Sequence, residues 1–284
     1  MKLLNLGCGQ KYHKDWINID FVSHNENVLQ HNLLDGIPLK DDDVEVVYHS
    51  HVLEHFSKHD GFHFMEECYR VLNKEGIIRV AVPDLEIIAR EYIKNLELAL
   101  EGDNEAKHNY DWIKLELFDQ TVRNESGGEM KHYLYQPIIQ NEAYVFERIG
   151  SEGKIIRESY LNQQLVKDDK HQKKQHQSSF FKLIFKKGEA FIRKIKASES
   201  PKNMTQQELK ALEIGSFRLG GEVHLWMYDR YSLSELLKKV GFTEIKLCSA
   251  FESEISNWEK YQLDVINGVV RKPDSLFMEA KKLS

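Results

Sequence analysis

A glycine-rich turn near residue 1 is the first feature of this sequence that could do chemistry. The tripeptide Gly7-Cys8-Gly9 follows the short apolar run 2–6, and Asp20 stands eleven residues beyond Gly9. Glycines let a ligand approach the backbone closely, and an acid at the end of the next strand can accept hydrogen bonds from both hydroxyls of a ribose. This spacing predicts a binding site for a cofactor that contains a nucleoside.

The residue three positions after the second glycine separates two classes of cofactor. A dinucleotide site needs a small residue there, because helix and strand must pack closely around a pyrophosphate. This chain has Tyr12 at that position. The bulky ring therefore favours S-adenosylmethionine, which carries no phosphate, over a nicotinamide dinucleotide.

Methyl transfer from a sulfonium to a hydroxyl needs an in-line nucleophile and usually a base that takes its proton. Our catalytic candidates are, in order, His224, Asp84 and His51, since each is expected at the carboxyl edge of a parallel sheet and histidine titrates near neutral pH. Glu54 and His55 fall in the same region. An acid at the beginning of a helix, however, also suits the helix dipole.

A second polar cluster lies at residues 119–132, around the turn Gly127-Gly128. Arg123 and Glu129 could bind hydroxyls or a phosphate there, so we predict them as substrate-binding residues of a loop that closes over a polar acceptor. An exposed loop without that role is the alternative. The segment Gly220-Gly221-Glu222 repeats the Gly-Gly-Glu pattern and could be a second loop of the same lid.

Apolar and amphipathic stretches alternate over the first 85 residues, which is typical of a parallel sheet with crossover helices. We expect strands at 2–6, 16–20, 44–49, 76–82, 244–250 and 275–281, with helices at 58–72 and 85–117. Ser232 and Glu235 have the spacing of a capping box, which predicts a helix from Ser232 to Val240. The expected fold class is α/β, a Rossmann-like doubly wound sheet, mostly parallel, whose last strand is antiparallel.

The middle of the chain differs from its two ends. We predict a cofactor-binding core at 1–84 and 224–284, and a largely helical cap at 85–223. Within the cap, segment 180–196 places Phe and Ile on one helical face and Lys and Arg on another. Such a helix either packs on the protein or lies on anionic lipid, so peripheral contact with the inner membrane face is an alternative.

These elements together resemble a class I S-adenosylmethionine-dependent methyltransferase of the type found in polysaccharide and surface-glycan biosynthesis. The matching segments are 3–9 with Asp20, Asn32-Leu33, 46–55, 69–76 and 224–242. Two positions depart from the family, because Asn5 and Asn32 stand where an acid is often found. Their amides can still hydrogen-bond, so the resemblance implies weaker electrostatics at the cofactor and not its absence.

The resemblance also implies which residues hold the cofactor. Gly7, Cys8 and Gly9 would pass beneath the methionine part, Asp20 would hold the ribose, and Phe21 would lie against the adenine. Asn32 and Leu33 would meet the adenine edge, and His49 and Ser50 would face the sulfonium. The full set of implied cofactor-binding residues is Asn5, Gly7, Cys8, Gly9, Asp20, Phe21, Asn32, Leu33, His49 and Ser50.

Composition limits the remaining classes of protein. The chain has 284 residues, a formal net charge of −6 and three dispersed cysteines, and it contains no apolar run of membrane-spanning length. We expect a cytoplasmic protein without disulfides or metal ligands and without a groove for nucleic acid. The small net charge of the whole chain hides one basic segment, because residues 167–202 contain 11 Lys and Arg against 4 Asp and Glu.

The expected function is S-adenosylmethionine-dependent O-methylation of a sugar or glycan intermediate, with a small molecule or glycan as acceptor. One alternative is a nicotinamide-dependent oxidoreductase. The other is a non-catalytic protein that binds the cofactor or docks on a membrane, which Asn5, Asn32 and the basic segment would suit.

Overall fold

The computed structural model describes residues 1–23, 25–169 and 204–283. The chain divides into two compact units. The first comprises Met1–Lys94, Ala143–Glu152 and Leu225–Ser284, and the second comprises Asn95–Glu142 and Gly153–His224. Segment 180–196, which was expected to form the basic amphipathic helix, lies outside the described residues.

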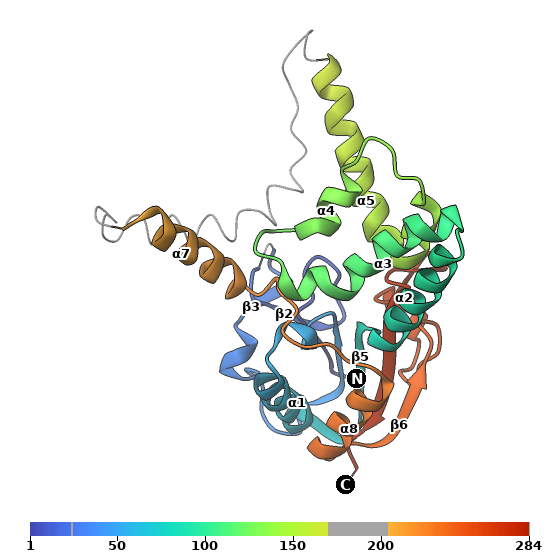
Figure 1. Ribbon diagram of the computed structural model, residues 1–284. Coiled ribbons are helices and arrows are strands. Elements are labelled where there is room, and N and C mark those ends of the chain that lie inside the picture. Colours follow the sequence, from blue (N-terminus) through green and yellow to red (C-terminus); the bar gives the residue numbers. More distant parts are fainter. Residues whose placement is uncertain (24, 170–203, 284) are drawn as a thin grey trace. The chain divides into compact units, whose positions relative to one another are not determined.

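The first unit is built on a seven-stranded sheet with the order β3-β2-β1-β4-β5-β9-β6 (Figure 1). Its strands are β1 (Leu3–Leu6), β2 (Ile17–Asp20), β3 (Val28–Gln30), β4 (Val44–Ser50), β5 (Leu72–Pro83), β6 (Thr243–Cys248) and β9 (Ser275–Lys281). Strands β1 to β5 pair in parallel, and β9 runs antiparallel to both β5 and β6. This sheet confirms the predicted Rossmann-like fold class, including the antiparallel last strand.

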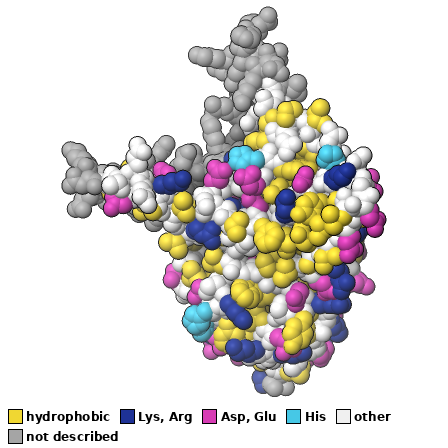
Figure 2. Space-filling model, in the orientation of Figure 1, with side chains coloured by type: hydrophobic (Ala, Val, Ile, Leu, Met, Phe, Trp, Pro, Cys, Tyr) yellow, Lys and Arg dark blue, Asp and Glu magenta, His cyan; other side chains and the backbone are white. Residues whose placement is uncertain are grey.

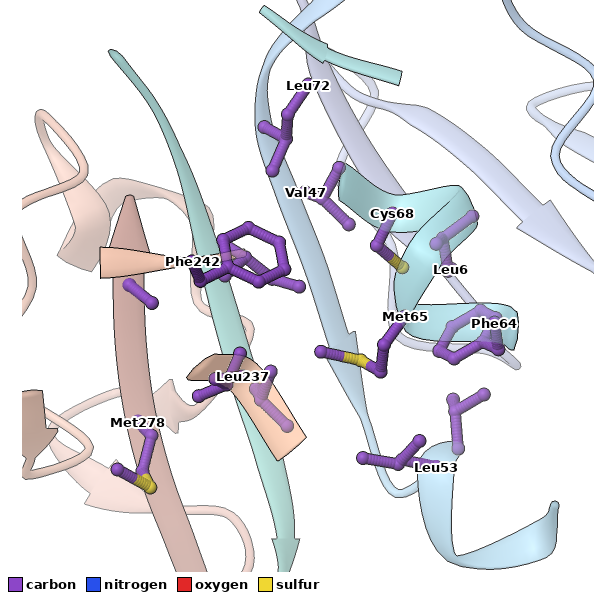
Figure 3. Packing of buried hydrophobic residues seen from close by; sticks show 14 of the residues in the cluster. Leu6, Val47, Leu53, Phe64, Met65, Cys68, Leu72, Leu237, Phe242 and Met278 are labelled. Carbon is purple, nitrogen blue, oxygen red and sulfur yellow. The ribbon is translucent and has the colours of Figure 1, made fainter. Parts of the chain in front are cut away.

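Helices α1 (Lys58–Val71) and α8 (Arg230–Val240) cover one face of the sheet. Figure 3 shows Leu6 and Val47 of the sheet packed among Met65 and Cys68 of α1, with Leu237 of α8 in the same cluster. All five side chains are completely buried. Burial of an aliphatic side chain of this size stabilises the fold by roughly 1.5–3 kcal/mol, so this cluster holds the two helices on the strands that lead to the glycine loop.

An aromatic cluster covers the opposite face of the sheet. Successive residues of a strand point to opposite faces, so Tyr48 lies on this side and Val47 on the other. Tyr48, next to Val47 in β4, lies edge-on to Trp16 at 6.1 Å and to Trp258 at 5.3 Å between ring centroids. Trp258 begins the short helix α9 (Trp258–Tyr261). The segment between β6 and the two-stranded hairpin β7 (Val265–Ile266) and β8 (Val269–Val270) therefore forms part of the core.

A buried ion-pair network holds the same C-terminal segment. The Arg79 guanidinium of β5 is fully buried and donates to Asp264 and to Glu279, each over 2.8 Å. The hydroxyl of Tyr48 donates to the other carboxylate oxygen of Asp264 over 2.6 Å. Buried charges of this kind are tolerated only when they are paired and hydrogen-bonded, as they are here.

Helix boundaries differ from expectation at two places. The helix α8 begins at Arg230, and Asp229 is its N-cap, with Ser232 completing the capping box from the third position. The predicted N-cap at Ser232 was therefore wrong, since Asp229 caps equally well three residues earlier. The predicted helix 85–117 is two helices, α2 (Leu85–Leu100) and α3 (Asn104–Val122), because Gly102 has a φ of 100° and Asp103 caps α3.

The second unit is helical in the part that the structure describes. It contains α3, α4 (Gly128–Leu134), α7 (Gln206–Arg218) and most of α5 (Glu142–Asp169). No helix among the described residues is long and apolar enough to cross a membrane. Figure 2 shows acidic and basic side chains interspersed with apolar ones on the visible face.

Candidate functional site

The glycine loop follows β1 directly and has the backbone geometry that glycine permits. Gly7 and Gly9 have φ values of 61° and 54°, in the left-handed region that other residues rarely adopt. A Cβ on Gly7 would lie 2.3 Å from Cγ2 of Val52, whereas a Cβ on Gly9 would meet nothing within 4 Å. Gly7 is therefore required for packing, and Gly9 faces open space that a ligand can occupy.

The loop is fastened to the end of β2. The backbone N–H groups of Gly7 and Cys8 both donate to the carbonyl oxygen of Ile19. The N–H of Gly9 donates to Oδ2 of Asp20 over 2.9 Å, and the N–H of Val22 donates to Oδ1 over 2.9 Å. An ionised carboxylate has about four acceptor positions, so Asp20 keeps capacity for the two hydroxyls of a ribose.

Asn5 lies behind this loop, in the interior of the first unit. Its Nδ2 donates to the carbonyl oxygen of Lys11 and to Oδ1 of Asn18, both over 3.1 Å, and the residue is buried. The amide thereby connects β1, the end of the glycine loop and β2. An acid at this position could make neither donation, which explains why an amide works here. Its direct contact with the cofactor stays a prediction.

The residues predicted at the adenine lie at the same edge of the sheet. Phe21 follows Asp20 and is 60% exposed, so its ring offers a free apolar surface. Asn32 caps the short 3-10 helix η1 (Leu33–Asp35) by accepting from the N–H of Leu34. Leu33 packs partly against the core. The glycine loop, the spare acceptors of Asp20 and the Phe21 ring together fit an adenosine-containing cofactor.

His49 and Ser50 are predicted at the sulfonium. Their surroundings in the structure suit a structural role. The His49 ring is completely buried beside Phe64, and among the described residues neither ring nitrogen has a hydrogen-bond partner. Burial lowers the pKa of His49 to about 3, so the ring is neutral. The Ser50 hydroxyl accepts from Arg271, which also binds Glu152. Contact of either residue with the cofactor stays a prediction.

Titratable groups cluster where β4 ends. His51 follows β4 with a φ of 56°, and its backbone N–H donates to Ala81 of β5. Its Nε2 lies 2.8 Å from Oγ of Ser275, the first residue of β9, and its Nδ1 lies 3.2 Å from Oε1 of Glu54. Because β9 is antiparallel, its first residue meets the carboxyl ends of the parallel strands.

The burial of Glu54 is not evident from the sequence. It lies in the 3-10 helix η2 (Leu53–His55) and is completely buried, and burial raises its pKa to about 8. Neither carboxyl oxygen has a hydrogen bond of good geometry within the described residues. In the sequence, an acid at the beginning of a helix is typical of an exposed side chain that interacts with the helix dipole. Only the three-dimensional packing shows that Glu54 is buried. No motif or spacing in the sequence indicates a role for Ser275.

Asp84 has a structural task in the first unit. Its Oδ1 accepts from the N–H groups of Glu86 and Ile87, which caps the first turn of α2. Burial raises its pKa, although these two hydrogen bonds oppose that shift. A carboxyl group engaged in a cap is less suited to take a proton from an acceptor than the His51 imidazole.

The remaining predicted residues belong to the second unit. His224 is buried, and its backbone N–H donates to the carbonyl of Gln120 in α3. The Arg123 guanidinium pairs with Asp119 over 2.5 Å and with Glu222 over 3.2 Å. Glu129 is exposed at the first turn of α4, and its N–H donates to Asp119. Their roles in catalysis and substrate binding stay predictions.

The two Gly-Gly-Glu segments lie together in the second unit. The carboxylate of Glu222 accepts from the Ser126 hydroxyl over 2.6 Å and from the N–H of Gly127 over 2.7 Å. A Cβ on Gly128 would lie 2.5 Å from the carboxylate of Asp119, so the turn can only be closed by glycine. The polar loop is thus an ordered element.

Comparison with known proteins points to one class. Residues 11–80 match the family model described as a methyltransferase domain. Among curated proteins, no sequence matches the chain. The matched segment includes Asp20, His51 and Glu54, whereas the glycine loop 7–9 and Ser275 lie outside it.

Several solved structures are similar at low identity. One is a methyltransferase from Archaeoglobus fulgidus with 11% identity, covering 99% of this chain and 86% of that chain, with a TM-score of 0.37. Another, from Thermotoga maritima, has 14% identity, covers 99% of this chain and 82% of that chain, and has a TM-score of 0.39. A chain of a Haloferax volcanii complex containing the Trm112 methyltransferase activator has 19% identity and a TM-score of 0.26, and the similarity covers 33% of this chain and only half of that one.

The match of residues 11–80 to a methyltransferase domain, together with the strand order and the glycine loop with Asp20, supports a Rossmann-like, S-adenosylmethionine-dependent methyltransferase. Its cofactor is S-adenosylmethionine. The same match favours S-adenosylmethionine over a nicotinamide dinucleotide.

Proposed function

We propose that this protein transfers a methyl group from S-adenosylmethionine to a hydroxyl of a sugar or glycan intermediate. The observation that carries the proposal is the joint geometry of the glycine loop and Asp20, in which Gly9 faces open space and the carboxylate keeps free acceptor positions. When bound, the cofactor supplies an electrophilic methyl group on a sulfonium. The chain itself must hold the nucleoside, orient an acceptor and remove its proton.

A polar acceptor is supported by the loop of the second unit. Arg123 has a side chain only 8% exposed, and its Nε is buried without a hydrogen-bond partner within the described residues. Asp119 and Glu222 hold the guanidinium in place, so the loop presents a fixed cluster of charged groups of the kind that binds hydroxyls or a phosphate. Glu129 extends from the same loop toward solvent and could accept from sugar hydroxyls.

Of the three catalytic candidates, His51 is best supported as the base. It lies at the carboxyl edge of the sheet, on the strand next to β1 and its glycine loop. Its ring contacts Ser275 through Nε2 and Glu54 through Nδ1, which fixes the imidazole at this edge. We further propose a cytoplasmic protein, with peripheral contact at the inner membrane face as the alternative.

A transfer assay with methyl-labelled S-adenosylmethionine tests the proposed function. Nucleotide sugars, oligosaccharides and lipid-linked sugars are offered in parallel with amine and catechol acceptors. We expect label in a carbohydrate as an ether that resists alkali, and loss of at least about 100-fold in kcat for His51→Gln, since general-base catalysis contributes roughly 10²–10⁴-fold. Label confined to amine acceptors would refute the sugar hydroxyl as the acceptor.

A further inference from the structure

Three side chains of the first unit form a chain that the sequence did not suggest. Ser275 Oγ lies 2.8 Å from Nε2 of His51, and Nδ1 of His51 lies 3.2 Å from Oε1 of Glu54. The three residues come from the start of β9, the end of β4 and the helix η2. One ring nitrogen of His51 thus faces a hydroxyl, and the other faces a carboxyl group. This is the arrangement of a hydroxyl–imidazole–carboxylate relay.

The three side chains differ in how deeply they are buried. Ser275 is 7% exposed and the His51 side chain 11%, whereas Glu54 has no exposed surface. The carboxyl end is therefore closed to water, whereas Ser275 and His51 each keep a small exposed fraction at the carboxyl edge of the sheet. In a buried setting a carboxyl group interacts with an imidazolium more strongly than it would in water.

We propose that Ser275, His51 and Glu54 act as a proton relay, in which Ser275 takes the acceptor proton, His51 receives it, and Glu54 positions the His51 ring. The inference rests on the proposed function. It adds two residues, Ser275 as a proton carrier and Glu54 as a positioning residue, to the single base named above.

The acceptor oxygen forms its bond to the methyl carbon while the methyl–sulfur bond breaks and its electron pair stays on sulfur. The acceptor proton passes to Oγ of Ser275, and the original Ser275 proton passes to Nε2 of His51. The imidazolium then carries one proton on each ring nitrogen, with Nδ1–H directed at Glu54. Release of the Nε2 proton to solvent, with the hydrogen on Nδ1 retained, restores the resting state.

The resting state must therefore have one particular tautomer. Nε2 must hold the lone pair that accepts from the Ser275 hydroxyl, and Nδ1 must carry the hydrogen that faces Glu54. The 3.2 Å separation at Nδ1 lacks ideal hydrogen-bond geometry. Catalytic contacts of this kind often shorten only when the substrate is bound. Burial also raises the pKa of Glu54 to about 8, so near neutral pH the carboxyl group is largely protonated and accepts from Nδ1–H through its carbonyl oxygen.

Nitrogen NMR of the full-length protein with ¹⁵N-labelled histidine tests this arrangement without any acceptor. The His51 signals are assigned by their loss in His51→Gln. We expect the Nδ1–H tautomer in the wild type, a shift of the Nε2 resonance in Ser275→Ala that Ser275→Thr reverses, and a shift of the Nδ1 resonance in Glu54→Gln. His63 is the internal control, because its Nδ1 pairs with Glu66 on the exposed side of α1, and its signals should not move.

An Nε2–H tautomer at His51 would overturn the proposal, because that nitrogen could not then accept the serine proton. Unchanged His51 signals in both Ser275→Ala and Glu54→Gln would overturn it too. Urea unfolding of each variant shows whether it is folded, so a collapsed variant is not mistaken for an effect on the ring.

Turnover supplies the second readout once an acceptor has been found. Ser275→Ala and Glu54→Gln should each lower kcat at least about 10-fold while the KM for the cofactor changes less than about 2-fold. Imidazole added to His51→Gly should restore part of kcat. Equal losses in kcat and cofactor binding would indicate a structural role instead. Failure of S-adenosylhomocysteine to bind would refute the proposed function and leave the NMR result on the relay intact.

Discussion

The backbone N–H of Gly9 donates to Oδ2 of Asp20 over 2.9 Å. This hydrogen bond joins the end of the glycine loop to the end of β2. The carboxylate is also held from its other oxygen by the N–H of Val22. The distance between the loop and the acid is thus set by the protein before any ligand is bound, which reduces the ordering cost of binding.

The two glycines of the loop should respond differently to alanine. Gly7→Ala adds a Cβ that would lie 2.3 Å from Val52 at a φ of 61°, so both steric overlap and backbone strain destabilise it. We expect a loss of more than about 2 kcal/mol in unfolding free energy. Gly9→Ala has the strain alone and should lose only about 1–2 kcal/mol. Urea unfolding measures both values, and equal stabilities would contradict the packing role of Gly7.

Restoring the acid that the family often carries should not improve this protein. Asn5→Asp removes the two N–H donations to Lys11 and Asn18 and places a charge in a buried position. We expect a loss of about 1–3 kcal/mol in stability and no gain in cofactor affinity. Thermal unfolding and calorimetry with S-adenosylhomocysteine check this together. Tighter binding in a variant of unchanged stability would show that Asn5 weakens the site.

The buried His49 predicts a loss of stability in acid. Burial lowers the pKa of its folded state from 6.5 to about 3, so the unfolded chain binds the extra proton first as pH falls. Stability is therefore full above pH 6.5 and falls between pH 6.5 and 3. His49→Leu removes this term, and between pH 7 and 5 the wild type should lose about 2 kcal/mol more than the variant. Parallel urea curves at the two pH values test the difference.

The Arg79 network should be costly to break. Arg79→Leu would leave Asp264 and Glu279 as buried carboxylates without their shared cation, and we expect a loss of about 3–5 kcal/mol. Arg90→Leu is the matched control, because Arg90 pairs with Glu86 on the surface and should cost less than about 1 kcal/mol. A small effect of Arg79→Leu would mean that the aromatic cluster alone holds the C-terminal segment.

Strong local patterns made most of the first unit predictable from sequence. The apolar run before Gly7 and the acid at Asp20 mark two strands and a loop whose geometry depends on nearby residues. The strand β3 escaped prediction because it has three residues, of which two are exposed. The capping box of α8 was misplaced because Asp229 and Ser232 are both good N-cap residues, and only the helix start decides between them.

The candidate site was harder to predict, for a physical reason. Glu54 stands 221 positions before Ser275, and their connection through His51 depends on the antiparallel entry of β9. A buried acid beside a helix start has the same sequence pattern as an exposed one. The sequence predicts His51 as a candidate after His224 and Asp84, and it contains no sign of the contacts with Ser275 and Glu54.

Calorimetric titration with S-adenosylhomocysteine tests the central claim most directly. We expect one binding site on the wild type and unchanged affinity in Asp15→Ala. In Asp20→Ala we expect an affinity at least about 10-fold weaker, since a lost hydrogen bond to a charged group costs about 1.5–3 kcal/mol. Asp15 is an exposed acid that pairs with Lys260 and serves as the control. Absence of binding to the wild type, or equal affinity in Asp20→Ala, would contradict the assignment of this loop and acid to the cofactor.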